Sequence, residues 1–178
     1  MRMKTRNKVL LIVQAAMIAA IYVVITYFIG AFNLASGVFQ VRISEALTIL
    51  PVFTPAAIPG LFVGCIISNI LTGCMPLDVV FGSLATLIGA CGTYALRKYK
   101  WLAPLPPIVA NTIIVPFVLS YVYMFEGTIP FFMLTVGVGE IISCYVLGMF
   151  LMTVLGRYRN VIFRNDAFES KSAEISQG

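Results

Sequence analysis

Long stretches without a charged side chain limit the possible folds of this chain more than any other feature of its sequence. The first runs over residues 9–29, and a helix that crosses a bilayer needs about 20 consecutive apolar residues. Hydrophobic residues make up 60% of the 178 residues and charged residues 11%, whereas an average soluble domain is about 25% charged. Such a chain cannot cover a water-facing globule with polar groups. The sequence therefore predicts an all-α integral membrane protein.

Six apolar stretches follow one another along the chain. They cover residues 9–29, 41–52, 56–71, 77–96, 105–124 and 131–155. The second and third are almost continuous, so they form either one kinked helix or two helices. Pro51, Pro55 and Pro59 favour two helices, because proline removes a backbone N–H donor and disfavours helix in the residue before it.

Basic residues gather at three places between or beside these stretches. They are Arg2, Lys4, Arg6 and Lys8, then Arg97, Lys98 and Lys100, and finally Arg157, Arg159 and Arg164. Such clusters mark the cytoplasmic side of membrane proteins, and they share a side if six helices are present but not if five are. The sequence thus predicts a six-helix domain over residues 1–156 in the cell membrane, with both termini cytoplasmic, and a polar tail over residues 157–178. We expect the first stretch to be a retained helix, because it is long for the apolar part of a signal peptide.

The composition also excludes several classes of function. The chain has no histidine, which removes the usual general base and the commonest metal ligand. It has no GxxxxGK[ST] loop with which to hydrolyse a nucleotide. Its cysteines Cys65, Cys74, Cys91 and Cys144 are widely separated, as is typical of packing residues rather than metal ligands. We therefore expect neither an enzyme nor a metal protein, and the basic clusters indicate membrane topology rather than nucleic-acid binding.

Five charged residues lie outside the basic clusters and the tail. They are Arg42, Glu45, Asp78, Glu126 and Glu140. Counting from Phe131 at 1.5 Å per residue puts Glu140 roughly 13 Å below the outer end of its helix, near the middle of the bilayer. An ionisable group at that depth is costly and is a candidate functional residue. The alternative is a structural carboxyl group that is protonated or hydrogen-bonded to a neighbouring helix.

These five residues form a set with one base and four acids, which the predicted topology places on the outer side or inside the membrane. A net negative set favours a cation or a molecule rich in N–H donors. Asn33 and Asn69 add neutral hydrogen-bonding groups near the same side. Two structural alternatives stay open: Arg42 and Glu45 could form an ion pair between positions i and i+3, and Asp78 could be an acid that stabilises a helix N-terminus.

Small residues recur at helical spacing in three of the predicted helices. The first helix carries Ala15, Ala16, Ala19 and Ala20, the fourth carries Gly82, Thr86, Gly89 and Thr93, and the sixth carries Gly137, Glu140, Cys144 and Gly148. Small side chains let helices approach closely in lipid. We expect the last two stripes to pack inside the bundle, with Asn111 of the fifth helix forming an interhelical hydrogen bond. The alanine stripe faces either the interior or an external partner.

Four ordered blocks of sequence resemble the QueT family. They are FQVRISEALTILPVFTPAAIPGLFVG at 39–64, LDVVFGSLATLIGA at 77–90, LAPLPPIVANTII at 102–114 and GEIISCYVLG at 139–148. Members of this family are substrate-binding S components of energy-coupling factor transporters, assigned to uptake of queuosine precursors. The resemblance implies a six-helix S-component bundle with a pocket that faces outward.

The resemblance also implies partners that this chain does not contain. They are a transmembrane coupling protein and two cytoplasmic ATPases, which hydrolyse the ATP, so no cofactor is expected in this chain. In such S components the small-residue face of the first helix contacts the coupling protein, and Ala15, Ala16, Ala19 and Ala20 match that pattern.

The implied ligand is a 7-deazaguanine, such as 7-aminomethyl-7-deazaguanine, queuine or queuosine. One carboxylate can accept both the N1–H and the exocyclic amine of its guanine-like edge, and Glu140 has the chemistry for that role. A second acid, Glu45, Asp78 or Glu126, could bind an amine on the 7-substituent. Two alternatives remain: an S component for another small cationic or vitamin-like nutrient, and a structural membrane protein without transport activity.

Overall fold

We describe the protein from a computed structural model, which covers residues 5–31 and 42–162. Residues 1–4, 32–41 and 163–178 lie outside the described residues. Asn33 and most of the predicted tail therefore receive no structural description. The last helix continues beyond residue 156 to Ile162, so the predicted tail boundary at residue 157 falls inside a helix.

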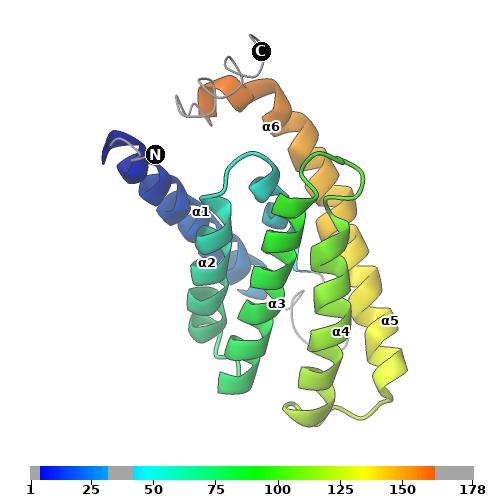
Figure 1. The fold of residues 1–178 in the computed structure, drawn as a ribbon. Helices are drawn as coiled ribbons and strands as arrows, with labels where there is room; N and C mark the ends of the chain where they lie inside the picture. The colour runs from blue at the N-terminus through cyan, green and yellow to red at the C-terminus, as the bar shows by residue number, and fades with distance from the viewer. Residues whose placement is uncertain (1–4, 32–41, 163–178) are drawn as a thin grey trace.

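All regular structure in the described residues is helical (Figure 1). The elements are α1 (Thr5–Ala31), η1 (Ile43–Val52), α2 (Ala57–Leu71), α3 (Pro76–Ala95), α4 (Leu105–Tyr121), α5 (Ile129–Glu140), η2 (Ile141–Leu147) and α6 (Gly148–Ile162). η1 is a 3₁₀ helix, and η2 is a π-helix that joins α5 to α6 without a break. When α5, η2 and α6 are counted as one segment, the helical segments match the six apolar stretches of the sequence. The second and third stretches form separate helices, as the prolines predicted.

The surface and the longer helices suit a membrane protein. Three segments are long and apolar enough to cross a membrane, namely Lys8–Gly30, Pro76–Ala95 and Ile129–Tyr158, whereas η1, α2 and α4 are apolar but shorter. Large apolar side chains, such as Phe28 and Phe150, are exposed along the outside of the bundle. Exposed apolar surface on this scale suits contact with lipid tails. The six-span count remains a prediction.

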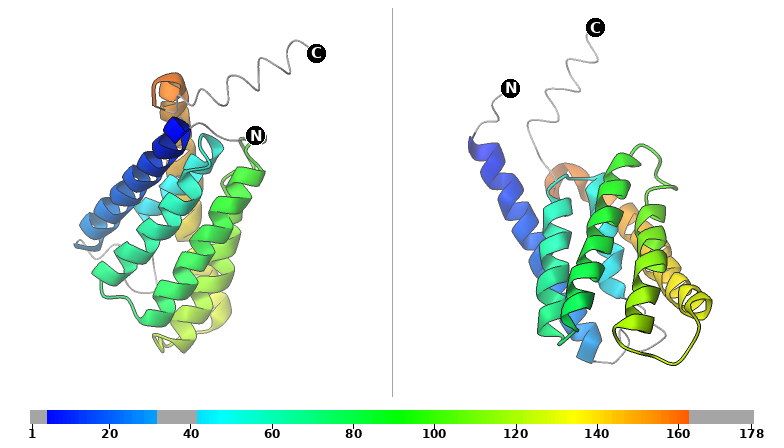
Figure 2. Two further views of the ribbon diagram at one scale, coloured as in Figure 1. Left: turned by 60° about the vertical axis from the view of Figure 1, so that its left-hand side comes forward. Right: turned by 60° about the horizontal axis from the view of Figure 1, so that its bottom comes forward.

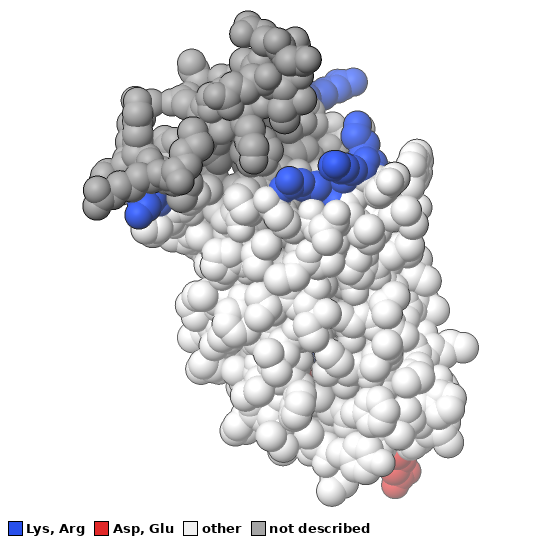
Figure 3. All heavy atoms as spheres, in the orientation of Figure 1, with Lys and Arg blue, Asp and Glu red and all other residues white. Residues whose placement is uncertain are grey.

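The two ends of the bundle differ in charge. Successive segments run in alternating directions (Figure 1), so the η1–α2 and α3–α4 connections and the end of α6 share one end. Exposed basic residues lie at this end, including Lys98 in the α3–α4 connection and Arg157 in α6, and Figure 3 shows this basic end. Glu126 is exposed in the α4–α5 connection at the other end. The arrangement agrees with a shared side for the basic clusters, although which side of the membrane each end faces stays a prediction.

The short helix η1 lies at the centre of the bundle. α1 packs on α2, α2 on α3, α3 on α4 and α4 on α5, and α3 lies between α2 and α4 in both views of Figure 2. η1 contacts α1, α2, α3, η2 and α6. Every residue from Ser44 to Pro51 is buried. Because Glu45 lies in the first turn of η1, the fold surrounds this carboxyl group with side chains from several helices.

The structure divides the alanine stripe of α1 between two faces. A Cβ added to Gly60 of α2 would lie 2.7 Å from the carbonyl oxygen of Ala15, and one added to Gly64 would lie 3.1 Å from the Cα of Ala19. Ala15 and Ala19 therefore pack against the glycines of α2. Ala16 and Ala20 are exposed. Of the four residues expected to contact a partner, this second pair is the one open to another protein.

Candidate functional site

Two carboxyl groups and a thiol meet in the centre of the bundle. Glu45 from η1, Glu140 from α5 and Cys144 from η2 each place a side-chain oxygen or sulfur within 4.8 Å of the other two. Glu45 is 0% exposed and Glu140 is 4% exposed. Like charges at this separation repel each other strongly away from water. The pair therefore favours a ligand that brings N–H donors or positive charge.

Hydroxyl groups from two helices hold one oxygen of the Glu45 carboxyl group. The Tyr22 hydroxyl of α1 donates to Glu45 Oε1 at 2.5 Å, and the Thr86 hydroxyl of α3 donates to the same atom at 3.4 Å. The Thr48 hydroxyl donates to the backbone carbonyl of Glu45 at 2.6 Å. The other carboxyl oxygen, Glu45 Oε2, is buried and has no hydrogen-bond partner among the described residues. The surrounding chain thus orients Glu45 and leaves one acceptor open.

Asn111 of α4 places an unpaired donor beside this acceptor. Its side chain lies next to both Glu45 and Glu140 and is 1% exposed. Its Nδ2 atom is buried and makes no hydrogen bond of ordinary geometry to the described residues, although the amide is close enough to both acids to act on them as a donor. An unpaired buried donor or acceptor costs about 1–3 kcal/mol. An adjacent donor and acceptor suit a ligand that carries both kinds of group on one edge.

The same central groups could also hold a metal ion, which the sequence did not predict. Among the described residues, Glu45, Glu140 and Cys144 have a suitable spacing. However, the Cys144 thiol donates a hydrogen bond to Glu140 Oε2 at 3.1 Å, whereas a metal ligand would be the thiolate, which has no proton to donate. The arrangement therefore favours a hydrogen-bonding ligand over a metal.

A second acidic group lies at the start of α3. Asp78 is buried, its Oδ2 atom accepts a hydrogen bond of 2.8 Å from the Tyr123 hydroxyl, and its Oδ1 atom has no partner. Tyr123 belongs to the α4–α5 connection, where burial raises the pKa of its phenol above the usual value and the bond to Asp78 raises it further. The phenol therefore stays protonated and keeps donating to Asp78.

Arg42 and Asn69 gather with Asp78 over Gly82 of α3. A Cβ on Gly82 would lie 3.3 Å from both Asn69 Nδ2 and Asp78 Oδ1, and 3.9 Å from Arg42 Nη1. The missing side chain leaves room between these polar groups. Arg42 interacts electrostatically with Asp78 and also with Glu45, so it connects the two acidic groups.

Both structural alternatives from the sequence can be compared with these contacts. Within the described residues, no ion pair joins Arg42 to Glu45, whose carboxyl group is hydrogen-bonded by hydroxyls instead. Asp78 does lie in the first turn of α3, where an acid stabilises the helix N-terminus, and its carboxyl group also accepts the hydrogen bond from Tyr123. Both acids are thus turned toward other side chains.

Five of the predicted site residues fall into two groups, and two lie outside them. Glu45 and Glu140 form the central group, and Arg42, Asp78 and Asn69 form the group at the start of α3. Glu126 is exposed in the α4–α5 connection and belongs to neither group. Asn33 lies outside the described residues.

Sequence reasoning did not assign Tyr22, Thr86, Asn111 or Cys144 to the site. Thr86 and Cys144 belong to the small-residue stripes, which are buried as predicted apart from the half-buried Gly137. Tyr22 lies one helical turn after the buried Ala19, and that spacing was the available signal. Asn111 was expected to bond between helices, and its side chain does interact with Glu45 of η1 and Glu140 of α5, although its Nδ2 atom makes no hydrogen bond of ordinary geometry.

The helix that carries Glu140 changes its winding directly after this residue. η2, the π-helix, begins at Ile141 and includes Ser143, whose buried hydroxyl has no hydrogen-bond partner. Apolar periodicity predicted an ordinary helix here. A π-helical turn within an α-helix is frequent at functional sites, so its position beside Glu140 supports a binding role for this region.

Comparison with known proteins gives two matches that span most of the chain. Residues 12–157 match the QueT transporter family. A relative from Lactococcus lactis subsp. cremoris (strain MG1363), described as queuosine precursor transporter QueT, is 29% identical over 163 residues, which cover 85% of this chain and 95% of the relative. No solved structure matches the chain. The family match includes both acidic groups.

Proposed function

Because this chain belongs to the QueT transporter family, we propose that it is the substrate-binding S component of an energy-coupling factor transporter for a queuosine precursor. Family membership indicates a membrane transporter rather than an enzyme. The description of the Lactococcus relative as a queuosine precursor transporter supports the substrate class. The candidate ligands are 7-aminomethyl-7-deazaguanine, queuine and queuosine.

The unpaired atoms of Glu45 and Asn111 are the observation that carries this proposal. A deazaguanine edge offers the N1–H and the exocyclic amine as donors, with the O6 oxygen beside them as an acceptor. Glu45 Oε2 is a buried acceptor and Asn111 Nδ2 a buried donor, and neither makes a hydrogen bond of ordinary geometry to the described residues. Each would gain the kind of hydrogen bond that it lacks, because carboxylates accept and amide nitrogens donate.

Glu140 shares the recognition of this edge with Glu45. The two carboxyl groups lie within 4.8 Å, so the two N–H groups of the ligand can reach both of them. Glu140 was the acid that the sequence favoured for this role, and the contacts around Glu45 add a second. Asp78, with its unpaired Oδ1 atom, is the acid suited to an amine on the 7-substituent.

Transport in this proposal needs proteins outside the chain. A transmembrane coupling protein and two cytoplasmic ATPases supply the energy, and six spans in the cell membrane hold both termini in the cytoplasm. The exposed pair Ala16 and Ala20 offers a flat helix face to the coupling protein. The loaded chain then rotates within the membrane and carries the ligand inward.

Calorimetry on the purified chain tests the binding site. Glu140→Gln and Glu45→Gln each replace an acceptor oxygen by an amide donor that faces a ligand N–H. Hydrogen bonds to charged groups contribute about 1.5–3 kcal/mol, so each change should weaken 7-aminomethyl-7-deazaguanine binding by roughly 10- to 150-fold.

Glu126→Gln is the matched control, because the same change falls on an exposed acid outside both groups. It should cost less than about tenfold, since exposed ion pairs contribute about 1 kcal/mol or less. Full affinity in a folded Glu140→Gln and a folded Glu45→Gln protein would contradict the site. Equal losses in all three variants would indicate a general effect of negative charge.

Coexpression tests the S-component role separately. An affinity-tagged chain should copurify with a coupling protein and two ATPases, and a variant that inactivates ATP hydrolysis should stop uptake without changing ligand binding. Uptake by this chain alone, unaffected by loss of the ATPases, would contradict that role while leaving the binding site intact.

A further inference from the structure

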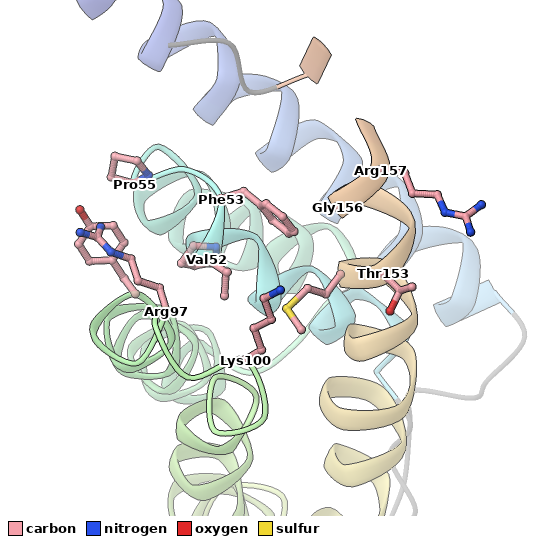
Figure 4. A pocket seen from close by; sticks show the side chains of 11 residues that line it. Val52, Phe53, Pro55, Arg97, Lys100, Thr153, Gly156 and Arg157 are labelled. Atoms are coloured by element: carbon pink, nitrogen blue, oxygen red, sulfur yellow. The ribbon is translucent and has the colours of Figure 1, made fainter. Parts of the chain in front are cut away.

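One oxygen of Asp78 is an open acceptor at the end of the bundle opposite the basic clusters. Asp78 is 3% exposed, and its Oδ1 atom makes no hydrogen bond to the described residues. The basic end also holds a cavity, of about 600 Å³ (Figure 4), but no residue that lines it has a buried, unpaired side-chain nitrogen or oxygen atom. Because buried polar groups are normally hydrogen-bonded, the open acceptor indicates that a ligand group binds at the start of α3.

Donor groups lie close to this acceptor without bonding to it. Asp78 Oδ1 and Asn69 Nδ2 each lie 3.3 Å from the position of a Cβ on Gly82, and Arg42 Nη1 lies 3.9 Å from it. Arg42 also interacts electrostatically with Asp78. A buried carboxyl group is expected to turn toward such donors, because an unpaired buried acceptor costs about 1–3 kcal/mol. Another contact must therefore hold the Asp78 carboxyl group in its observed orientation.

The Tyr123 hydroxyl makes that contact. It donates a hydrogen bond of 2.8 Å to Asp78 Oδ2, so this oxygen is engaged by the α4–α5 connection while Oδ1 lies over Gly82. Gly82 is one helical turn further along α3, and Thr86, one more turn along, donates to Glu45. The bond from Tyr123 thus leaves the open oxygen of Asp78 on the side of the central group.

The surrounding chain fixes the position of Tyr123. Its ring stacks on Phe125 with centroids 5.8 Å apart and packs against a buried apolar cluster that includes Phe132. Its hydroxyl also accepts a hydrogen bond of 3.2 Å from the backbone N–H of Met75. Met124, between the two stacked residues, has a φ of 53°, a left-handed conformation that costs a non-glycine residue about 1–3 kcal/mol and is concentrated at functional sites. A side chain held in this way can fix the carboxyl group that it touches.

We propose that Tyr123 is a positioning residue that makes the site selective for a ligand with a protonated amine. It keeps Asp78 from pairing with Asn69 and Arg42, so that Oδ1 stays open for an N–H of the ammonium group. This inference rests on the proposed function, which assigns the amine of the 7-substituent to Asp78. Charged donors form the stronger hydrogen bonds with a carboxylate. Without the phenol, the carboxyl group turns to the two donors of the protein, and the amine must compete with them.

Calorimetry with two ligands that differ by one amine measures this role. The purified chain is titrated with 7-aminomethyl-7-deazaguanine and with 7-methyl-7-deazaguanine, which keeps the guanine-like edge. Wild-type protein should bind the amine ligand roughly 10- to 150-fold more tightly, as expected for one hydrogen bond to a charged group. Tyr123→Phe keeps the ring and deletes the hydroxyl. It should lower this preference by about fivefold or more, the effect of one neutral hydrogen bond, and change affinity for the methyl ligand by less than about twofold.

Tyr121→Phe is the matched control, because it removes the same hydroxyl from an exposed tyrosine at the end of α4. It should leave both affinities unchanged. Asp78→Asn should abolish the preference for the amine. Adding Tyr123→Phe to Asp78→Asn should then change the ratio of the two affinities by less than about twofold, because the two residues act through one contact.

The outcomes that contradict this inference differ from those that contradict the proposed function. Equal losses for both ligands in Tyr123→Phe would overturn the positioning role in favour of a general structural one, and an unchanged preference would overturn it as well. Wild-type protein that binds both ligands equally would overturn the assignment of the amine to Asp78 and Tyr123 alone. Folded wild-type protein that binds neither ligand would overturn the proposed function, and this inference with it.

Discussion

Asn111 Nδ2 and Glu45 Oε2 are buried polar atoms that make no hydrogen bond of ordinary geometry to the described residues. Such groups destabilise the unliganded protein, because they lost their hydrogen bonds to water on folding. A ligand with complementary groups removes that cost when it binds. Stability of the free protein and affinity for the ligand should therefore change in opposite directions when the unpaired donor is removed.

Asn111→Leu tests this opposition directly. The change deletes the unpaired donor, so thermal unfolding of the ligand-free protein should occur at the same or a higher temperature. Deazaguanine affinity should fall by up to about tenfold, the worth of one neutral hydrogen bond. Thr112→Val is a close control, because Thr112 Oγ1 is also buried and unpaired but lies near Gly137 of α5. That variant should leave affinity unchanged, whereas equal losses in both variants would mean that α4 packing, not Asn111, sets affinity.

Helix α1 has two small-residue faces with different neighbours. Ala15 and Ala19 touch the glycines of α2, so larger side chains there would separate two packed helices. Ala16 and Ala20 are exposed, and larger side chains there meet no part of the described chain. Substitutions at the two pairs can thus distinguish an effect on the stability of this protein from an effect on its contact with a partner.

Leucines at the two pairs should give different defects. Ala16→Leu with Ala20→Leu should keep folding and ligand affinity but reduce copurification with the coupling protein and stop uptake. Ala15→Leu with Ala19→Leu should lower the temperature of thermal unfolding, because overpacking costs about 1–3 kcal/mol per site. Full uptake by the Ala16 and Ala20 variant would show that the partner binds elsewhere.

The number of segments and the break between η1 and α2 could be predicted because apolar length and proline act locally. Pro51, Pro55 and Pro59 each exclude backbone hydrogen bonds whatever surrounds them, and η1 and α2 are separate helices in the structure. Helical spacing also identified the alanine stripe, but it could not say which face turns inward. That choice depends on Gly60 and Gly64 of α2, a contact between distant parts of the sequence.

Site residues were predicted less completely for a similar reason. Glu45, Glu140 and Asp78 are recognisable because charge is rare in an apolar chain. The neutral partners Tyr22 and Asn111 are identified by three-dimensional contacts alone, since their helices carry other neutral polar residues as well, such as Gln14 and Thr112. The local helix type could not be predicted either, because hydropathy does not distinguish the 3₁₀ form of η1 or the π form of η2 from an α-helix.

At the scale of the whole molecule, charge separates the two ends of the bundle. Exposed lysines and arginines lie at one end and Glu126 lies at the other (Figure 3). Positive charge is retained on the cytoplasmic side of membrane proteins. We therefore expect the α3–α4 connection inside the cell and the α4–α5 connection outside.

Cysteine labelling measures this orientation. In a background without the native cysteines, Glu126→Cys should react with a membrane-impermeant thiol reagent in intact cells, and Lys98→Cys should react only after the membrane is opened. Both positions are exposed, so their reactivity differs by side and not by burial. Labelling of Lys98→Cys from outside intact cells would contradict the six-span arrangement.

The most direct test of the proposed site is a comparison of two ligands that differ in the pattern of their polar edge. 7-Deazaguanine presents two N–H donors beside an acceptor oxygen, whereas 7-deazaadenine presents a ring acceptor beside an exocyclic amine. In 7-deazaadenine, the ring acceptor would face Glu45 Oε2, which is also an acceptor, so no hydrogen bond could form there. Calorimetry with the purified chain should show 7-deazaguanine binding at least about a hundredfold more tightly than 7-deazaadenine. Equal affinity for the two compounds, or no binding of 7-deazaguanine by folded protein, would contradict the assignment of the central acidic group as the substrate site.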